Sequence, residues 1–302
     1  MKLCPLVLLF VSIGMFAQKP PNAAAQNQPA QPPAGMDAGE AQARAWFAER
    51  RQAHPGLKQV AEGKYLIFDD EDAPPQETSS SDTWTLWNSP NGEFEVNGIL
   101  GFSDESVPYW INLTSRMRPT AFKVFRPDKT SIGCQRTPSK LLCQQTDNEG
   151  RVLRTVDDDM SDPAEIFMPI TFFWAGLTRN AEFPGGKAAH FTLVAEGGET
   201  MTFPVSYNPI GASLKLLRRG KYPVLQGEMD AAQFQLATQD PSERPSTPPP
   251  GSGNAPGSEP PQPYVPMFDL WVSSNGILLS ASPPGTQVEY VRLVQFKKLA
   301  DF

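Results

Sequence analysis

The sequence is poor in histidine, cysteine and positive charge. Its 302 residues include two histidines and three cysteines, and 26 lysines and arginines stand against 33 aspartates and glutamates, for a formal charge of −7. Two histidines exclude a metal centre built mainly of imidazole ligands. Nucleic-acid binding needs clustered cations that contact phosphates, so we expect no nucleic-acid partner, and the same acidity disfavours direct binding to an anionic membrane.

Short motifs of the common enzyme classes are also missing. The sequence has no G-x-S-x-G elbow, no H-E-x-x-H zinc motif, no P-loop and no G-x-G-x-x-G loop. His54 lies at the end of a predicted helix and His190 starts an apolar run, and both positions are typical of structural histidines. The acidic runs at 69–72 and 157–159 lack the spacing of a calcium-binding loop. We therefore expect no catalytic residues, no metal site and no cofactor.

The N-terminus has the layout of a secretory signal peptide over residues 1–17. Lys2 supplies a positive charge, an apolar run covers 3–16, and the small residue Ala17 precedes polar sequence. The run is shorter than the roughly 20 residues that span a bilayer. We expect a secreted protein of the periplasm or the extracellular space that is not integral to the membrane, with a retained N-terminal anchor as the alternative.

Signal cleavage would remove Cys4 and leave an even number of cysteines. The remaining two, Cys134 and Cys143, flank a segment with Pro138-Ser139 near its middle. Two strands folded about that turn would bring the thiols opposite each other, and an oxidising compartment would then favour a disulfide. Two free buried thiols are the alternative.

Two stretches rich in proline and small polar residues divide the chain. Residues 18–37 and 238–266 carry too few apolar side chains to offset the entropy of ordering them, so we expect a disordered tether and a disordered insertion. Helix-forming composition covers 38–56. The remaining sequence, 57–302, is expected to form one β domain, which the insertion interrupts as a passive spacer or as a ligand for a partner protein.

From about Tyr65 onward, apolar and polar residues alternate in short runs separated by turn residues. Asn91-Gly92 between two such runs is a strong hairpin signal. The whole series predicts an antiparallel meander. Some runs, such as 288–296, are apolar on both faces, which indicates a sheet that is covered twice or curls around a helix and an apolar cavity. A two-sheet sandwich is the alternative.

Residues 163–177 interrupt the β pattern. Asp162 has the residue type of a helix N-cap, Pro163 suits the first helical position, and the following residues are apolar on nearly all sides. Pro169 predicts a kink in this helix. The resulting fold class is mainly β with a buried helix: a strongly curved antiparallel sheet, or half-barrel, wrapped around a kinked central helix.

Two segments resemble a bacterial periplasmic domain-of-unknown-function family with the half-barrel of the outer-membrane lipoprotein carriers (LolA/LolB-like). SDPAEIF at 161–167, continuing through 177–179 to FPGG at 183–186, is similar to the family's helical section, and FDLWVSSNG at 268–276 to its closing hairpin. Pro169 and the insertion depart from the family pattern. The resemblance implies a half-barrel and a lipid-carrier analogy, without an established activity.

We therefore expect a non-enzymatic cell-envelope protein that binds an apolar ligand, a lipid or an acyl chain, in the half-barrel cavity. Burial of each methylene group contributes about 0.8 kcal/mol, so an acyl chain needs little polar machinery. The expected lining residues are large and apolar: Trp84, Phe94, Phe122, Phe172, Phe173, Trp174, Trp271 and Tyr290. The alternative is a structural or scaffolding envelope protein that reaches a partner through 238–266, and an enzyme ranks third.

Overall fold

A single sheet makes up most of the structure. The computed structural model describes residues 38–68, 80–102, 105–137, 139–159, 164–167, 178, 188–197, 206–225, 227–239, 264–286 and 289–302. The first elements are helix α2 (Ala38–Ala53) and strands β1 (Lys58–Ile67), β2 (Ser80–Asn88), β3 (Phe94–Gly101), β4 (Ser106–Leu113), β5 (Pro119–Phe125), β6 (Ser131–Arg136), β7 (Lys140–Thr146) and β8 (Val152–Asp159). The later strands are β9 (Ala164–Phe167), β10 (Ala189–Gly197), β11 (Ser206–Val224), β12 (Gly227–Gln239), β13 (Tyr264–Ser273), β14 (Leu278–Ser282) and β15 (Val291–Lys298).

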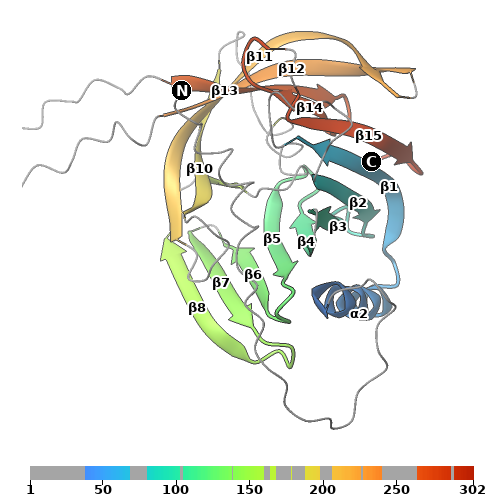
Figure 1. Ribbon diagram of the computed structural model, residues 1–302, viewed down its shortest axis with the longest axis vertical. Helices are drawn as coiled ribbons and strands as arrows, with labels where there is room; N and C mark the ends of the chain where they lie inside the picture. The colour runs from blue at the N-terminus through green and yellow to red at the C-terminus, as the bar shows by residue number, and fades with distance from the viewer. Residues whose placement is uncertain are drawn as a thin grey trace, which may run out of the picture.

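The strand order follows the chain except at one place. The order is β8-β7-β6-β5-β4-β3-β2-β1-β15-β14-β13-β12-β11-β10-β9, so β1 pairs with β15 in the middle of the 15-stranded sheet. Figure 1 shows the blue strand β1 beside the red strand β15, and the strands following one another around a ring. All pairings are antiparallel except that of β9 with β10. This arrangement confirms the mainly β fold with a strongly curved antiparallel sheet.

The prediction of a helix that starts at Pro163 is wrong for the first turn of that helix. Residues Ala164–Phe167 form strand β9, which pairs in parallel with β10 through Ile166 opposite Val194. Pairing with the edge of the sheet has overridden the local capping signal, since Ile and Phe suit a strand as well as a helix. Residues 168–177, including Pro169, lie outside the described residues.

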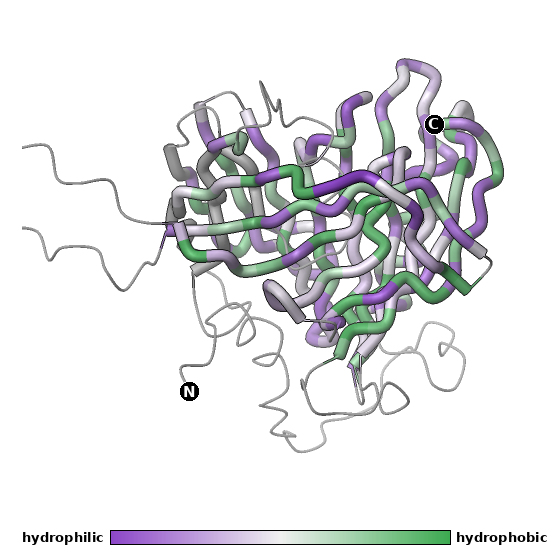
Figure 2. Tube along the Cα trace, turned by 90° about the horizontal axis from the view of Figure 1, so that it is seen from above, coloured by the Kyte–Doolittle hydropathy of each residue, from purple (hydrophilic) through white to green (hydrophobic). Residues whose placement is uncertain are grey.

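Alternating side chains give the sheet two distinct faces. One face, called the inner face, carries a continuous apolar cluster that extends over β1–β7 and β11–β15. One of its rows crosses the sheet through Leu86, Val96, Ile111, Phe122 and Cys134, each paired with the next. Figure 2 shows the resulting alternation of apolar and polar residues along the strands. The opposite face is called the outer face.

Glycines make room for large rings on the inner face. Trp84 is paired with Gly63 on one side and Gly98 on the other, and Tyr109 is paired with Gly98. A Cβ atom at Gly63 would overlap the Trp84 ring, and one at Gly98 would overlap the Tyr109 ring. The glycines therefore let both rings lie flat against the neighbouring strands, and both rings are almost completely buried.

Helix α2 covers the outer face of β4 and β5, outside the ring of strands (Figure 1). Trp46 and Phe47 pack on Trp110 and Phe125, with ring centroids 5.3 Å apart for the two tryptophans and 5.8 Å apart for the two phenylalanines. The predicted helix over 38–56 is thus found at Ala38–Ala53, and the main chain of His54 bonds back to Arg50 at its end.

Cys134 and Cys143 form the predicted disulfide. They lie directly opposite each other on β6 and β7, and both are buried. Disulfides persist in oxidising compartments, so this bond indicates a location outside the cytoplasm. It confirms the pairing that the even cysteine count predicts.

The predicted insertion is shorter than 238–266. Strand β12 continues to Gln239 and strand β13 begins at Tyr264, and these two residues are paired. The prediction placed both boundaries too far out because Thr238 and Val265 continue the ladder in spite of their proline-rich neighbours. Residues 240–263 lie outside the described residues.

Candidate functional site

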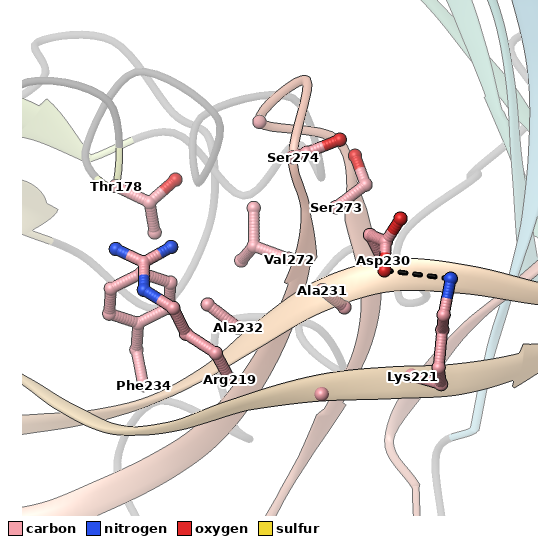
Figure 3. Close-up of a pocket in the computed structure, with 12 residues that line it drawn as sticks. Thr178, Arg219, Lys221, Asp230, Ala231, Ala232, Phe234, Val272, Ser273 and Ser274 are labelled. Carbon is pink, nitrogen blue, oxygen red and sulfur yellow. Dashed lines mark ion pairs between the residues drawn. The ribbon is translucent and has the colours of Figure 1, made fainter.

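A pocket opens on strands β11, β12 and β13. Its volume is about 670 Å³. Its floor is apolar and consists of Ala231, Ala232, Phe234 and Val272. All four belong to the apolar cluster of the sheet. Figure 3 shows these residues below an open space that is bordered by charged and hydroxyl side chains.

Small residues account for the open volume. Arg219, Ala232 and Val272 are paired in one row across the three strands, and Gly220, Ala231 and Ser273 form the next row. A Cβ atom at Gly220 would meet nothing within 4 Å. Because side chains alternate along a strand, the row of Arg219, Ala232 and Val272 lies on the pocket face, and the row of Gly220, Ala231 and Ser273 lies on the opposite face. On the pocket face, Ala232 leaves space of the kind that a ring fills at Trp84.

Two cations border the pocket from the same strand. Arg219 and Lys221 are two residues apart on β11, so their side chains leave the strand on the same face. Lys221 Nζ lies 2.8 Å from Oδ1 of Asp230, which is its cross-strand partner. The hydrogen bond to Asp230 and its negative charge raise the pKa of Lys221.

Arg219 lacks such a neutralising partner. Within the part of the chain that the structure describes, its guanidinium forms neither an ion pair nor a hydrogen bond with a carboxylate. Figure 3 shows this guanidinium on the side of Thr178, with the ion pair of Lys221 and Asp230 farther along the ribbon. Among the described residues, the pocket therefore combines an apolar floor with one positive charge that no carboxylate neutralises.

The opposite wall is a tight turn. Residues 273–276 form the turn, with Gly276 at a φ of 82° and its amide donating to the carbonyl of Ser273. The hydroxyl of Ser273 accepts a hydrogen bond of 3.0 Å from the amide of Ile277. The Ser274 amide donates to the carbonyl of Asp230, which holds the turn against β12.

The inner face also contains a buried carboxylate, Asp82. It is fully buried and accepts a hydrogen bond of 2.8 Å from the Tyr109 hydroxyl. Burial, and next the charge of Asp82, raise the pKa of both Tyr65 and Tyr109 above the ordinary value of 10.0. Among the described residues, no group of three or more His, Cys, Asp and Glu is placed to hold a metal ion.

Three of the aromatic residues predicted to line a cavity lie together in the inner-face cluster. Trp84, Phe94 and Phe122 are exposed by only 1%, 5% and 9%. None of them lines the pocket between β11 and β13. Their contact with a ligand stays a prediction.

Trp271 is turned to the outer face, but it is partly buried and packs against the same apolar cluster. Its neighbours in the strand, Leu270 and Val272, belong to the inner-face cluster, and alternation turns Trp271 to the other side. Its ring lies 5.0 Å from the Arg218 guanidinium and 5.3 Å from the Tyr222 ring. Contact of Trp271 with a ligand stays a prediction.

The remaining predicted lining residues divide into two groups. Tyr290 packs on Phe268 with ring centroids 6.3 Å apart and does not line the pocket. Phe172, Phe173 and Trp174 lie outside the described residues. Prediction from large apolar residues missed the pocket because its floor includes two alanines, and the available signal was the basic run at 218–221 on a strand.

The chain was compared with protein families, curated proteins and solved structures. Neither a family model nor a curated protein matches the sequence. The structure is similar to that of a beta-barrel-like protein of domain of unknown function DUF1849 from Brucella abortus, with a TM-score of 0.42 and 8% sequence identity over 80% of this chain and 98% of that chain. A similarity of this degree establishes no activity, and the relation to lipoprotein carriers stays a prediction.

Among the described residues, no helix is both long enough and apolar enough to cross a bilayer.

Proposed function

We propose that this protein is a non-enzymatic, secreted cell-envelope protein that binds a lipid or an acyl chain in the pocket between β11 and β13. The observation that supports this proposal is the pocket itself, with a volume of about 670 Å³ and a floor continuous with the apolar cluster. Sites for small ligands commonly enclose about 300–1,000 Å³ and are mostly apolar. The disulfide between Cys134 and Cys143 supports the periplasmic or extracellular location that residues 1–17 predict.

The energetics suit an apolar chain. Each buried methylene group contributes about 0.8 kcal/mol, so ten of them contribute about 8 kcal/mol before the cost of association. Phe234 and Val272 supply apolar contact area, and Ala231 and Ala232 leave the width that a flexible chain occupies. No catalytic group is needed for this activity.

Filling the pocket tests the proposal. Titration of the signal-cleaved protein with a fluorescent acyl probe should give saturable binding, and Ala232→Phe should reduce the affinity at least about tenfold because the ring occupies the floor. Ala300→Phe, at an exposed alanine near the C-terminus, is the matched control and should bind as the wild type does.

A second measurement checks whether the Ala232→Phe variant is folded. Near-UV circular dichroism should show that Ala232→Phe retains fixed tertiary structure, and Val272→Trp provides an independent way to fill the same floor. If the wild type binds no acyl probe, and native mass spectrometry finds no co-purifying lipid, the proposal fails.

A scaffolding role is the second candidate, and one observation favours it. Leu142, Val152 and Leu153 on β7 and β8 are exposed by 36%, 51% and 52%, at an end of the strand order. Edge strands with exposed aliphatic residues are templates for pairing with another chain. We propose that a partner protein would be bound there or through the insertion predicted at 238–266, and such a protein would retain its partner when Ala232→Phe closes the pocket.

A further inference from the structure

The charge around the pocket narrows the chemistry of its ligand, provided that the proposed function holds. Two arginines of the described residues show the contrast: Arg50 bonds Glu95 through two nitrogens, each at 2.7 Å, and Arg218 donates to Gln233 at 2.8 Å. Arg219 borders the pocket without a carboxylate partner among the described residues. Its position thus differs from that of a guanidinium used to fix the fold.

The other charged groups of the pocket do not neutralise Arg219. Asp230 is the carboxylate among the described residues that line the pocket, and it is already paired with Lys221 at 2.8 Å. The described lining residues include one lysine, one arginine and one aspartate, which leave a net charge of +1 beside the apolar floor. A guanidinium matches a carboxylate or a phosphate by two parallel hydrogen bonds, and these bonds are strengthened by charge.

We propose that the ligand is an amphiphile with an anionic head, a carboxylate or a phosphate, and that Arg219 binds this head while the acyl chain lies on the floor. Arg219 is paired with Ala232 at the centre of that floor, and Lys221 follows about 7 Å farther along the strand. When the head binds Arg219, the side chains of Phe234 and Val272 remain available to contact the acyl chain. Free acids and phospholipid heads share this chemistry.

Chain-matched ligands separate the contribution of the head from that of the tail. The probes are a long-chain fatty acid, the alcohol of the same chain length, a lysophosphatidic acid of that chain length, and inorganic phosphate alone. Wild-type protein should bind the fatty acid and the lysophosphatidic acid about tenfold more tightly than the alcohol, and inorganic phosphate only weakly. The ratio between the two acidic lipids identifies which head the site prefers.

Arg219→Gln should abolish the preference for the acids and leave binding of the alcohol unchanged. Arg218→Gln is the matched control, because it removes the same charge from the neighbouring residue on the outer face, where Arg218 contacts Gln233 and Trp271. That variant should keep the preference. Thermal unfolding of both variants checks that each is folded.

The outcomes distinguish this inference from the proposed function. If the wild type binds the alcohol and the fatty acid equally well, or if Arg219→Gln keeps the preference, the anionic head is disproved while acyl binding stands. If inorganic phosphate binds as tightly as the lysophosphatidic acid, the site recognises a free anion and the amphiphile is disproved. If none of the acyl ligands binds, the proposed function itself fails.

Discussion

Two regions of the same sheet, β1–β5 and β11–β13, use glycine in opposite ways. In the first, Gly63 and Gly98 are covered by the rings of Trp84 and Tyr109. In the second, Gly220 faces open space, and its neighbours across the strands are alanine and serine. The same hydrogen-bonding pattern thus accommodates a glycine that a ring covers and a glycine that stays open, and the side-chain volume in the cross-strand row decides between them.

The largest expected effect comes from adding a methyl group to the filled region. Gly98→Ala places a Cβ atom inside the Tyr109 ring, which is fully buried and hydrogen-bonded to Asp82 and so cannot move aside. We expect a loss of about 3 kcal/mol in the free energy of unfolding. Gly220→Ala is the control and should change it by less than about 0.5 kcal/mol. Urea unfolding measures both, and equal midpoints would contradict the comparison.

A smaller loss of stability is expected when the contact between helix α2 and strands β4 and β5 is weakened. The Glu95 side chain is only 9% exposed, and it accepts two bonds from Arg50 and one of 2.9 Å from the Trp110 indole. Arg50→Met leaves this carboxylate without its counter-charge and should cost about 2 kcal/mol in chemical unfolding. Acyl-probe binding should not change, because the pocket lies on other strands.

Arg44→Met is the control for that substitution. Arg44 pairs with Glu40 within α2, and its own side chain is 59% exposed. Solvent-exposed pairs of this kind contribute about 0–0.5 kcal/mol. A loss for Arg44→Met as large as that for Arg50→Met would show that the helix, and not the contact with Glu95, determines the effect.

The smallest effect on stability appears only at alkaline pH. Burial, together with Asp82, raises the pKa of Tyr65 and Tyr109 above the ordinary value of 10.0. Below pH 10 both phenols are protonated in folded and unfolded chains, so their stabilising contribution is complete. Above pH 10 the unfolded chain releases protons that the folded chain keeps, and stability falls as the pH rises.

Denaturant titrations at pH 8 and at about pH 11 measure this loss. Tyr109→Phe should make the pH dependence shallower, since one of the two groups can no longer ionise. Tyrosinate absorbance should show the two buried phenols ionising only as the protein unfolds. A pH dependence that Tyr109→Phe leaves unchanged would contradict the assignment.

Local signals were sufficient to predict the elements whose cause is local. The disulfide follows from an even pair of cysteines around a turn, the helix at Ala38–Ala53 from its composition, and the turn at Gly92 from Asn-Gly, with a φ of 82°. The alternation along β13 separates Trp271 from Leu270 and Val272, as observed. Which of the two faces points inward depends on distant strands, so the size of Trp271 does not by itself place it on the inner face.

Other features depend on partners that are distant in the sequence. Strand β9 forms because β10 offers an edge, although Asp162-Pro163 has the residue types of a helix start. The pocket depends on Ala231 and Ala232, whose residue type does not by itself indicate a binding site. They point to a pocket only once the pairing of Ala232 with Arg219 on the neighbouring strand is known. Arg219 itself is visible in the sequence as part of a basic run, but its lack of a carboxylate neighbour becomes visible only in three dimensions.

The pairing of β1 with β15 has a consequence for how the protein acquires its structure. Ala61 is paired with Lys298, so the seam between the two halves of the sheet joins residues that are far apart in the sequence. Contacts of such long range are formed late and slowly, because a long loop must be closed before they contribute. During synthesis, the two halves can therefore assemble as separate meanders, and the pairing of β15 with β1 joins them. Until then, the open edge of β1 needs protection from pairing with other chains, which gives molecular chaperones a defined place to act.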